Sequence, residues 1–474
     1  FIWCNFNVQS LPIFLIMNTL RNPLLYGTLA LIFVIAGCKK DNNDTPSTPA
    51  NNPGATASLA DRQKDSAVAI SRDIYLWYNQ IPASFNGRSY PNLNAIMEAI
   101  RQYSTEPGFT GPVDKWSFAV KQSEWNNVAS GISGDFGLGV LFRAADDLRV
   151  RSVEKNSPAA AAGIRRGWRI TAINGNSNIN TNNQELVING VFNAANTNFT
   201  FLKPDGSTQN IALTATNFQE NPVLLDTTYN IGSRKIGYLV FNSFLGDTIK
   251  IVNDFQRIFN NYTANNINDL IVDLRYNGGG YVNLQQQLAN YIAPPAANGQ
   301  MMMQYRFNDK HSRQNVPLFF NKKGSINLPR VVFLVSRFTA SASELLINNL
   351  KPFMEVVLVG PSRTVGKPVG YFPLEVGDEY IFPISFRTVN NRGEGSYFGG
   401  FQLNNQVADG LDKDWGDPAE STLASALRYL TTGAFRTAQQ PAFQPLSAQV
   451  EQGNNSLTRD AFSGMAAPSH TIKR

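Results

Sequence analysis

Histidine is almost absent from this chain of 474 residues, which contains only His311 and His470. A metal site built from several imidazoles is therefore excluded, and a Ser-His-Asp triad would have to use one of these two residues. Cysteine is equally rare: Cys4 and Cys38 are the only two. Neither a disulfide framework nor a cysteine-based zinc site is available.

Charge is also sparse, because only 16% of the residues are charged. The 41 Lys and Arg residues exceed the 35 Asp and Glu residues by six, and no Lys/Arg-rich run concentrates this excess. The sequence therefore argues against a nucleic-acid-binding surface. Hydrophobic residues make up 43% of the chain, so we expect most of it to be globular, and its length allows two or three domains.

The N-terminal region lacks an apolar run of the about 20 residues that an ordinary transmembrane helix needs. Residues 1–16 contain no Met, and we interpret them as an upstream extension of the reading frame. From Met17 the sequence is typical of an export signal, with Arg21 ahead of an apolar stretch over residues 24–34. The segment IAGC ending at Cys38 resembles a bacterial lipobox, whose cysteine is lipidated and becomes the first mature residue. The alternative is a signal peptide that merely contains a cysteine.

Changes of pattern divide the chain into segments. After the extension and signal peptide at 1–37, residues 38–60 are polar and rich in Pro, Asn and Thr, which predicts a flexible tether. Residues 61–128 begin with apolar residues at helical spacing, which predicts a small helical N-terminal domain. After Gly433 the chain is rich in Gln, Ala, Pro and Ser, so we expect disorder over 434–474.

Residues 129–215 have the pattern of a small β-rich domain. The segment FGLGVLF at 136–142, followed by SPAAAAGIRRGWRITAINGN at 157–176, resembles a PDZ domain. Such domains add an extended peptide to a sheet edge and hold its terminal carboxylate on backbone N–H groups of a glycine-containing loop. The alternative is that the glycines only form a bulge in a closed sheet. The residues that match the peptide-binding loop are Gly137, Leu138, Gly139 and Val140.

Residues 216–433 alternate short apolar strands with amphipathic helices. This alternation predicts an α/β core with a largely parallel sheet that is covered on both faces. The expected strands are 236–241, 270–274, 331–335 and 356–359. The expected helices are 248–262, 282–292, 341–350 and 420–430.

A glycine-rich junction, DLRYNGGG at 273–280, follows one of these strands directly. Three glycines let backbone N–H groups approach an anionic ligand closely at the start of a helix. A nucleotide-phosphate loop is one interpretation, but neither a GxGxxG nor a GxxxxGK[ST] frame is present. An oxyanion hole uses the same physics on a transient tetrahedral intermediate.

A serine-rich junction, SRFTASASE at 336–344, follows another strand and opens a helix. Ser341 and Glu344 fit a Ser-x-x-Glu capping box, which requires no catalytic role, and the local sequence favours that interpretation. The observation that favours chemistry is Lys367, just after the strand that ends at Gly360. A neutral lysine in an apolar pocket can deprotonate a serine and so replace the missing histidine.

The helical segment, the PDZ-like segment, DLRYNGGG, TASASELL and VGK, in this order, resemble the C-terminal processing peptidases, also called tail-specific proteases. The resemblance runs from about residue 61 to 430, and the lipobox suggests the Bacteroidota branch. It implies a crotonase/ClpP-like core with an inserted PDZ domain, and neither a cofactor nor a metal. It also implies Ser341 as nucleophile, Lys367 as general base, and oxyanion donors in the N–H groups of Ala342 and of Gly279 or Gly280.

Some residues depart from the pattern or allow another interpretation. Many family members carry Gln four residues after the lysine, where this chain has Tyr371, so the residue that orients Lys367 stays unassigned. Ser343 is the alternative nucleophile. We interpret His311 as a surface residue rather than a triad member. We interpret as a solvated acidic turn, rather than a cation loop, the residues Asp409, Asp412, Asp414 and Asp417.

Together these patterns predict an outer-membrane lipoprotein, anchored through Cys38 and facing the periplasm or the cell surface. We expect a serine endopeptidase that cuts proteins near their C-termini, with protein and peptide substrates as partners and no nucleic acid. One rival is a catalytically silent lipoprotein that binds peptides through the PDZ groove. Another is a hydrolase acting on a non-peptide ester or thioester. Intact Ser341 and Lys367 argue against the first, and the PDZ-like segment against the second.

Overall fold

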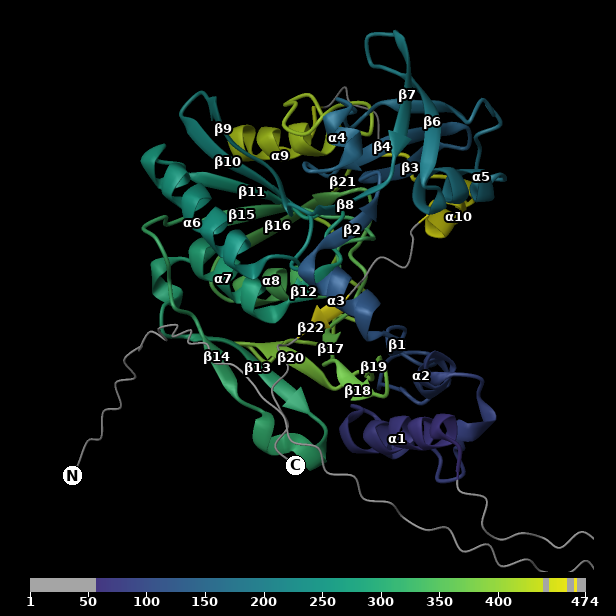
Figure 1. Cartoon of the computed structure of the whole chain (residues 1–474). Coiled ribbons are helices and arrows are strands. Elements are labelled where there is room, and N and C mark those ends of the chain that lie inside the picture. The colour runs from purple at the N-terminus through teal and green to yellow at the C-terminus, as the bar shows by residue number, and fades with distance from the viewer. Residues whose placement is uncertain (1–56, 438–442, 458–463, 467–474) are drawn as a thin grey trace, which may run out of the picture. The chain divides into compact units, whose positions relative to one another are not determined.

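The computed structural model describes residues 57–437, 443–457 and 464–466 (Figure 1). The described residues all belong to one compact unit. The export signal, Cys38 and the tether as far as residue 56 lie outside the described residues. Within the described part, none of the helices has the length and apolar character needed to cross a membrane.

A six-stranded sheet forms the centre of the predicted α/β core. Its strand order is β21-β16-β15-β11-β10-β9, and all neighbours are parallel except β9, which runs antiparallel to β10. The prediction of a largely parallel sheet is confirmed. The strands are β9 (Val223–Ile231), β10 (Arg234–Phe241), β11 (Asp269–Asp273), β15 (Arg330–Leu334), β16 (Glu355–Gly360) and β21 (Asn405–Gln406).

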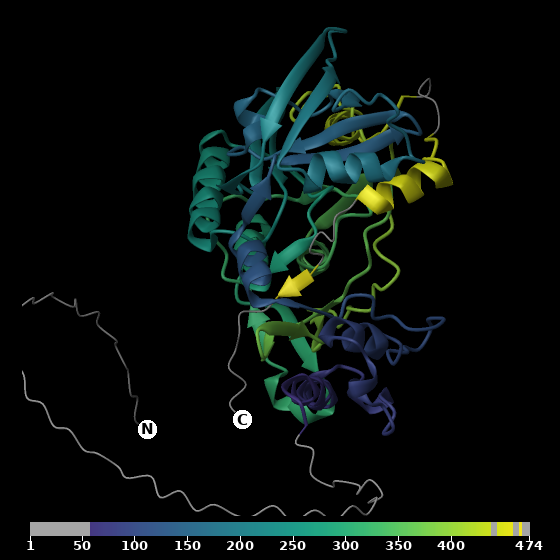
Figure 2. The same ribbon diagram turned by 45° about the vertical axis from the view of Figure 1, so that its right-hand side comes forward.

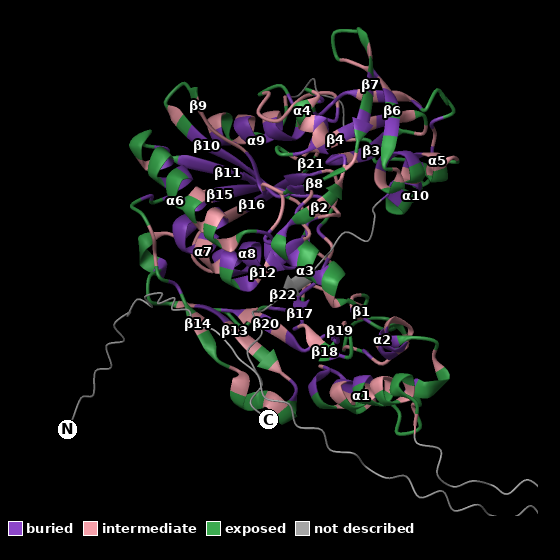
Figure 3. Cartoon of the chain, in the orientation of Figure 1, coloured by how far each residue is buried: buried purple, intermediate pink, exposed green. Residues whose placement is uncertain are grey.

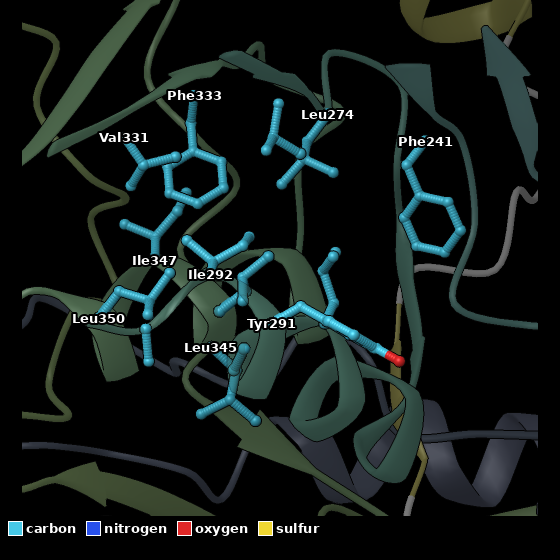
Figure 4. Close-up of a cluster of buried hydrophobic side chains, with 14 of the residues drawn as sticks. Phe241, Leu274, Tyr291, Ile292, Val331, Phe333, Leu345, Ile347 and Leu350 are labelled. Carbon is cyan, nitrogen blue, oxygen red and sulfur yellow. The ribbon is translucent and has the colours of Figure 1, made fainter. Parts of the chain in front are cut away.

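Helices cover both faces of this sheet, as predicted (Figure 1). On β15, Val331 and Phe333 belong to one buried cluster with the apolar residues of α8, while Val332 and Leu334 belong to a second cluster with α9. Alternate residues of a strand point to opposite faces, so one apolar strand can serve both clusters. Figure 4 shows the first cluster. The helices are α6 (Thr248–Ala264), α7 (Val282–Ile292) and α8 (Ala342–Leu350) on one face and α9 (Ser421–Thr432) on the other.

The predicted PDZ segment forms an antiparallel five-stranded sheet with its own buried cluster. The strand order follows the chain, so β3, which begins within the glycine-containing loop, is an edge strand. Ser157 caps the short helix α4, as predicted. The elements are β3 (Leu138–Ala144), β4 (Asp147–Val153), α4 (Pro158–Ala161), β5 (Arg169–Ile173), α5 (Gln184–Ile188), β6 (Asn196–Leu202) and β7 (Thr208–Thr214).

The N-terminal helices do not form a core of their own. They share one apolar cluster with strands that follow Lys367 in the sequence, and on the N-terminal side this cluster extends as far as Ala129, while the cluster of the PDZ segment begins at Phe136. Figure 3 shows the exposed outer side of α1 against the buried central strands. The elements of this region are α1 (Leu59–Ile74), α2 (Leu93–Arg101), β1 (Phe118–Lys121), α3 (Gln122–Ser130), β18 (Leu374–Val376) and β19 (Glu379–Phe382).

Two smaller sheets complete the part that positions the site. A four-stranded sheet has the order β14-β13-β20-β17, and a two-stranded sheet pairs β12 with β22. A further pair joins β2 (Ile132–Asp135) to β8 (Thr216–Gln219). The strands of the first two sheets are β14 (Pro317–Phe319), β13 (Met301–Phe307), β20 (Phe386–Asn390), β17 (Val369–Gly370), β12 (Gly279–Tyr281) and β22 (Gly464–Ala466).

The expectation of disorder after Gly433 is wrong for two short stretches. Residues 448–457 form the helix α10 (Ala448–Leu457), and residues 464–466 form β22. Val450 and Leu457 of α10 are buried in the apolar cluster of the PDZ region. Because tertiary packing rather than local propensity stabilises such a short helix, composition alone could not predict it.

Candidate active site

Ser341 lies at the strained junction that leads from β15 into α8. Its backbone has φ +59° and ψ −108°, a conformation that residues other than glycine seldom adopt. The side chain is fully buried, and its Oγ has no hydrogen-bond partner among the described residues. Strained backbone of this kind concentrates at functional sites.

The carboxylate of Glu344 joins the serine junction to the lysine segment. Its Oε2 accepts the N–H of Ser341 at 2.9 Å and the N–H of Lys367 at 2.8 Å. Its Oε1 accepts the N–H of Gly366 at 2.6 Å. Two nitrogens that bond to one oxygen lie no more than about 6 Å apart. The bond of Glu344 to the N–H of Ser341 is the glutamate half of the predicted capping box at the start of α8, and its bond to the N–H of Lys367 places that backbone beside Ser341.

Lys367 is fully buried in an aromatic pocket. Its Nζ lies 4.1 Å from the centre of the Tyr371 ring and 5.4 Å from that of Trp116. Burial lowers the pKa of Lys367 well below its usual value, although the charges of Asp114 and Glu344 partly oppose this shift. A lysine with a lowered pKa has a larger neutral fraction near pH 7, and the neutral amine can accept a proton.

Two residues of this pocket, Asp114 and Trp116, were not predicted from the sequence. Asp114 and Trp116 lie between α2 and β1, in the segment interpreted only as part of a helical domain. The Asp114 carboxylate is held in place because it accepts the Tyr75 hydroxyl at 2.8 Å and the N–H of Trp116 at 2.8 Å. No local motif marks these residues, since their relation to Lys367 arises only in the folded chain. Tyr371, noted as a departure from the family pattern, forms a wall of the pocket.

The hydrogen bonds of the glycine junction favour one of the two candidate oxyanion donors, Gly279 and Gly280, over the other. The N–H of Gly279 already donates to Asn277 Oδ1 at 2.9 Å, and its carbonyl accepts the N–H of Phe244 at 2.8 Å. Tyr281 also bonds to Phe244. Because backbone groups of successive residues in an extended strand face opposite sides, the N–H of Gly280 faces away from Phe244. Gly280 is therefore the better candidate donor.

Only glycine fits at position 280. Its φ is +136°, and a Cβ there would lie 2.3 Å from the carbonyl carbon of Phe244. Without a side chain at position 280, β12 can lie directly against the backbone of Phe244. The second candidate donor, Ala342, is the first residue of α8, where backbone N–H groups have no acceptor within the helix.

Asn277 holds the glycine junction against the serine junction. Its Nδ2 donates to the Phe241 carbonyl at 3.0 Å, while its own carbonyl accepts the N–H of Ala340 at 3.1 Å and the Ser343 hydroxyl at 3.1 Å. The hydroxyl of Ser343, the alternative nucleophile, is therefore engaged in a structural hydrogen bond. The structure thus favours Ser341 over Ser343.

The prediction of a solvated acidic turn is wrong for Asp409, because this side chain is largely buried. Its carboxylate bonds to Arg166 of the PDZ region at 2.7 Å and to Arg275 of the glycine junction at 2.8 Å. It also accepts the hydroxyl of Tyr276. Two arginines on one carboxylate offset the cost of burying these charges. Over the described ranges, no group of His, Cys, Asp and Glu residues is suited to holding a metal ion.

The remaining predicted residues lie apart from this cluster. Gly137 has a φ of +73° and precedes the edge strand β3, while Leu138 and Val140 belong to the core of the PDZ region. His311 pairs with Asp73 of α1, with 3.1 Å between Nε2 and Oδ1. This imidazole is partly buried rather than fully on the surface, and its partner is not a residue of the predicted dyad.

Two segments of the chain match models of known protein families, and the fold resembles that of a solved structure. Residues 235–400 match the model of peptidase family S41, and this range contains Ser341, Lys367 and the glycine junction. Residues 149–189 match the model of the PDZ domain. The structure is similar to that of a protein described as an S41 protease from Bacteroides fragilis, with a TM-score of 0.63 and 22% identity. That match covers 77% of this chain and 97% of the other, and it shows a shared fold.

Curated relatives are named as proteases. A CtpA-like serine protease of Staphylococcus aureus is 25% identical over 313 residues, which cover 62% of this chain and 60% of the relative. The carboxy-terminal processing protease CtpA of Bacillus subtilis is 26% identical over 259 residues, which cover 54% of this chain and 52% of the relative. The chain thus spans between half and two thirds of the length of these relatives. It carries a peptidase domain of family S41 over residues 235–400, together with a PDZ domain to which residues 149–189 belong.

Proposed function

We propose that the chain is a serine endopeptidase with a Ser341/Lys367 dyad, built on a crotonase/ClpP-like core, that cuts proteins near their C-termini. The observation that carries this proposal is the Glu344 carboxylate, whose Oε2 accepts the N–H groups of both residues. Burial lowers the pKa of Lys367, as a general base requires, and the hydroxyl of Ser341 has no other partner among the described residues that would compete for its proton.

The geometry supports acyl transfer in two steps. The Oγ of Ser341 attacks the carbonyl carbon of the scissile peptide bond while its proton passes to the Nζ of Lys367. The N–H groups of Ala342 and Gly280 stabilise the oxyanion, and the start of α8 adds its favourable dipole. The lysine then gives the proton to the departing amine, and water hydrolyses the ester.

Replacement of Glu344 by Gln is expected to lower kcat about 10- to 100-fold with little change in KM. Each carboxylate oxygen accepts at least one backbone N–H, so either orientation of the amide would point an NH₂ group at a donor. The substitution would therefore act by shifting Lys367 relative to Ser341 and not by removing a reacting group. Steady-state kinetics with a fluorogenic peptide, alongside a thermal unfolding curve, measure it. A variant that folds normally and keeps its kcat would contradict this role for Glu344.

The PDZ domain is proposed to recruit substrates by their C-terminal carboxylate, at the loop formed by residues 137–140. Amidation of a peptide substrate's C-terminus is then expected to raise KM more than it changes kcat, because the loop acts at a distance from the bond that breaks. Kinetics on a matched pair of free and amidated peptides measure the difference. Equal KM values would argue for binding that does not use the loop.

A lipid anchor on Cys38 is proposed to hold the enzyme at the outer membrane, facing the periplasm or the cell surface. This rests on the lipobox-like sequence, and several buried acyl chains give a stable anchor. Cys38→Ser is expected to move the full chain from the membrane fraction to the soluble fraction. Quantitative immunoblotting of the two fractions tests this, and an unchanged distribution would refute the anchor.

A further inference from the structure

A strand from the C-terminal region lies along the proposed oxyanion strand. β22 pairs in parallel with β12, which places Gly464 opposite Gly279, Met465 opposite Gly280 and Ala466 opposite Tyr281. β22 also lies close to β17, which begins two residues after Lys367. It therefore runs beside the proposed oxyanion strand and the strand that follows Lys367, and Figure 2 shows it as the yellow arrow near the centre of the molecule.

A substrate backbone is expected to lie beside β12 in the same position as β22. One edge of β12 is occupied by Phe244, so β22 pairs with the opposite edge, towards which the N–H of Gly280 points. A scissile carbonyl polarised by Gly280 would have to approach along that same edge. In keeping with an occupied site, Ser341 and Lys367 both have zero exposure to solvent.

The helix before this strand docks on β3, the edge strand of the PDZ domain that is proposed to bind peptides. The side chain of Asn454 in α10 bonds to both backbone groups of Phe142 in β3, to the N–H at 2.6 Å and to the carbonyl at 2.8 Å. These are the groups that an added peptide strand would use on an edge strand. Asn454 is 2% exposed, and Gln449 reaches Asn182, just before α5, at 3.2 Å.

The same helix also contacts the catalytic side of the structure. The guanidinium of Arg337, in the loop between β15 and Ser341, lies 3.4 Å from the carbonyl of Glu451 in α10. One short segment therefore touches the PDZ edge, the loop before the proposed nucleophile and, through β22, the proposed oxyanion strand. A segment held in this way meets the site at an effective concentration in the mM range.

We propose that α10 (Ala448–Leu457) and β22 (Gly464–Ala466) bind in cis as the enzyme's own first substrate, and that Ser341 cleaves the chain within β22. The inference rests on the proposed peptidase function. The Oγ of Ser341 bonds to the scissile carbonyl carbon as its proton passes to Lys367, and the C–N bond then breaks. The new amine takes that proton, and water hydrolyses the ester. The residues that follow the cut leave with the new amine, which frees the part of the β12 edge that they occupied for other chains, while α10 stays attached to the enzyme.

Intact-protein mass spectrometry of the purified full chain tests this proposal over a dilution series. Wild type is expected to lose the residues after Gly464 or Met465 at a rate independent of protein concentration, while Ser341→Ala stays whole. Hydrolysis of an unrelated peptide is followed in the same samples. If the peptide is cut but the segment stays whole, this inference is overturned and the proposed function stands. If neither is cut, the proposed function itself fails.

A matched pair of variants tests the role of α10. Asn454→Ala removes both hydrogen bonds to Phe142 and is expected to slow self-cleavage about tenfold. Gln452→Ala, at an exposed position of the same helix, is expected to leave the rate unchanged. Equal rates for both variants, or a self-cleavage rate that rises in proportion to protein concentration, would contradict binding in cis.

Discussion

Replacement of Ser341 by alanine is expected to reduce kcat/KM for peptide hydrolysis by at least about 10³-fold while the chain remains folded. The Oγ of Ser341 makes no hydrogen bond within the described residues, so the substitution removes no hydrogen bond among them. A buried hydroxyl without a partner costs about 1 to 3 kcal/mol, and its loss should therefore leave the free energy of unfolding unchanged or slightly higher. The Glu344 carboxylate keeps its bond to the backbone N–H.

Ser343→Ala provides the matched control in the same turn. It removes the hydroxyl that donates to Asn277, a bond worth about 1 kcal/mol, but not the proposed nucleophile. We expect its kcat to stay within about tenfold of wild type. Initial rates on a fluorogenic peptide, together with thermal unfolding curves, separate the two variants. Turnover that survives Ser341→Ala and is lost in Ser343→Ala would reverse the assignment.

Lys367→Met is expected to be as inactive as Ser341→Ala and yet more stable than wild type. Methionine fills the pocket between Tyr371 and Trp116 with an unbranched side chain that never takes a proton. In wild type, burial lowers the pKa of Lys367 well below 10.5. Between that lowered value and 10.5 the unfolded chain binds more protons at this residue than the folded chain does, so stability rises with pH in this window.

The gain in stability of Lys367→Met should accordingly be largest at low pH and shrink as pH rises. Lys367→Arg is the complementary variant, because a guanidinium stays protonated and cannot act as the base. Wild-type kcat/KM should increase with pH through the lowered pKa of Lys367 and then level off. Unfolding curves and kinetics over a pH series measure both effects. Near-normal turnover by either variant would rule out lysine as the base.

Motifs of a few residues were enough to select the residues of the proposed dyad and the glycine junction, which the folded chain brings close together. Ser341, Lys367 and the three glycines each follow a buried strand, and parallel strands bring their carboxyl ends to one edge of a sheet. The central sheet and the helices on its two faces were predictable for the same reason, since their apolar patterns are strong and local.

The rest depended on contacts between distant segments. Asp114 and Trp116 reach the pocket of Lys367 from the N-terminal region, and no spacing in the sequence links them to it. The preference for Gly280 over Gly279 follows from the bonds made by Asn277 and Phe244, which are visible only in the folded chain. Helix α10 has a weak pattern of its own and is stabilised by burial against the PDZ region.

The most direct test of the dyad is covalent labelling with a sulfonyl fluoride over a range of pH, followed by mass spectrometry of the labelled peptides. The account predicts one adduct, on Ser341, that forms faster as pH rises through the lowered pKa of Lys367. It also predicts that Lys367→Met stays folded but does not react. An adduct on another residue such as Ser343, or an unchanged labelling rate in Lys367→Met, would contradict the dyad.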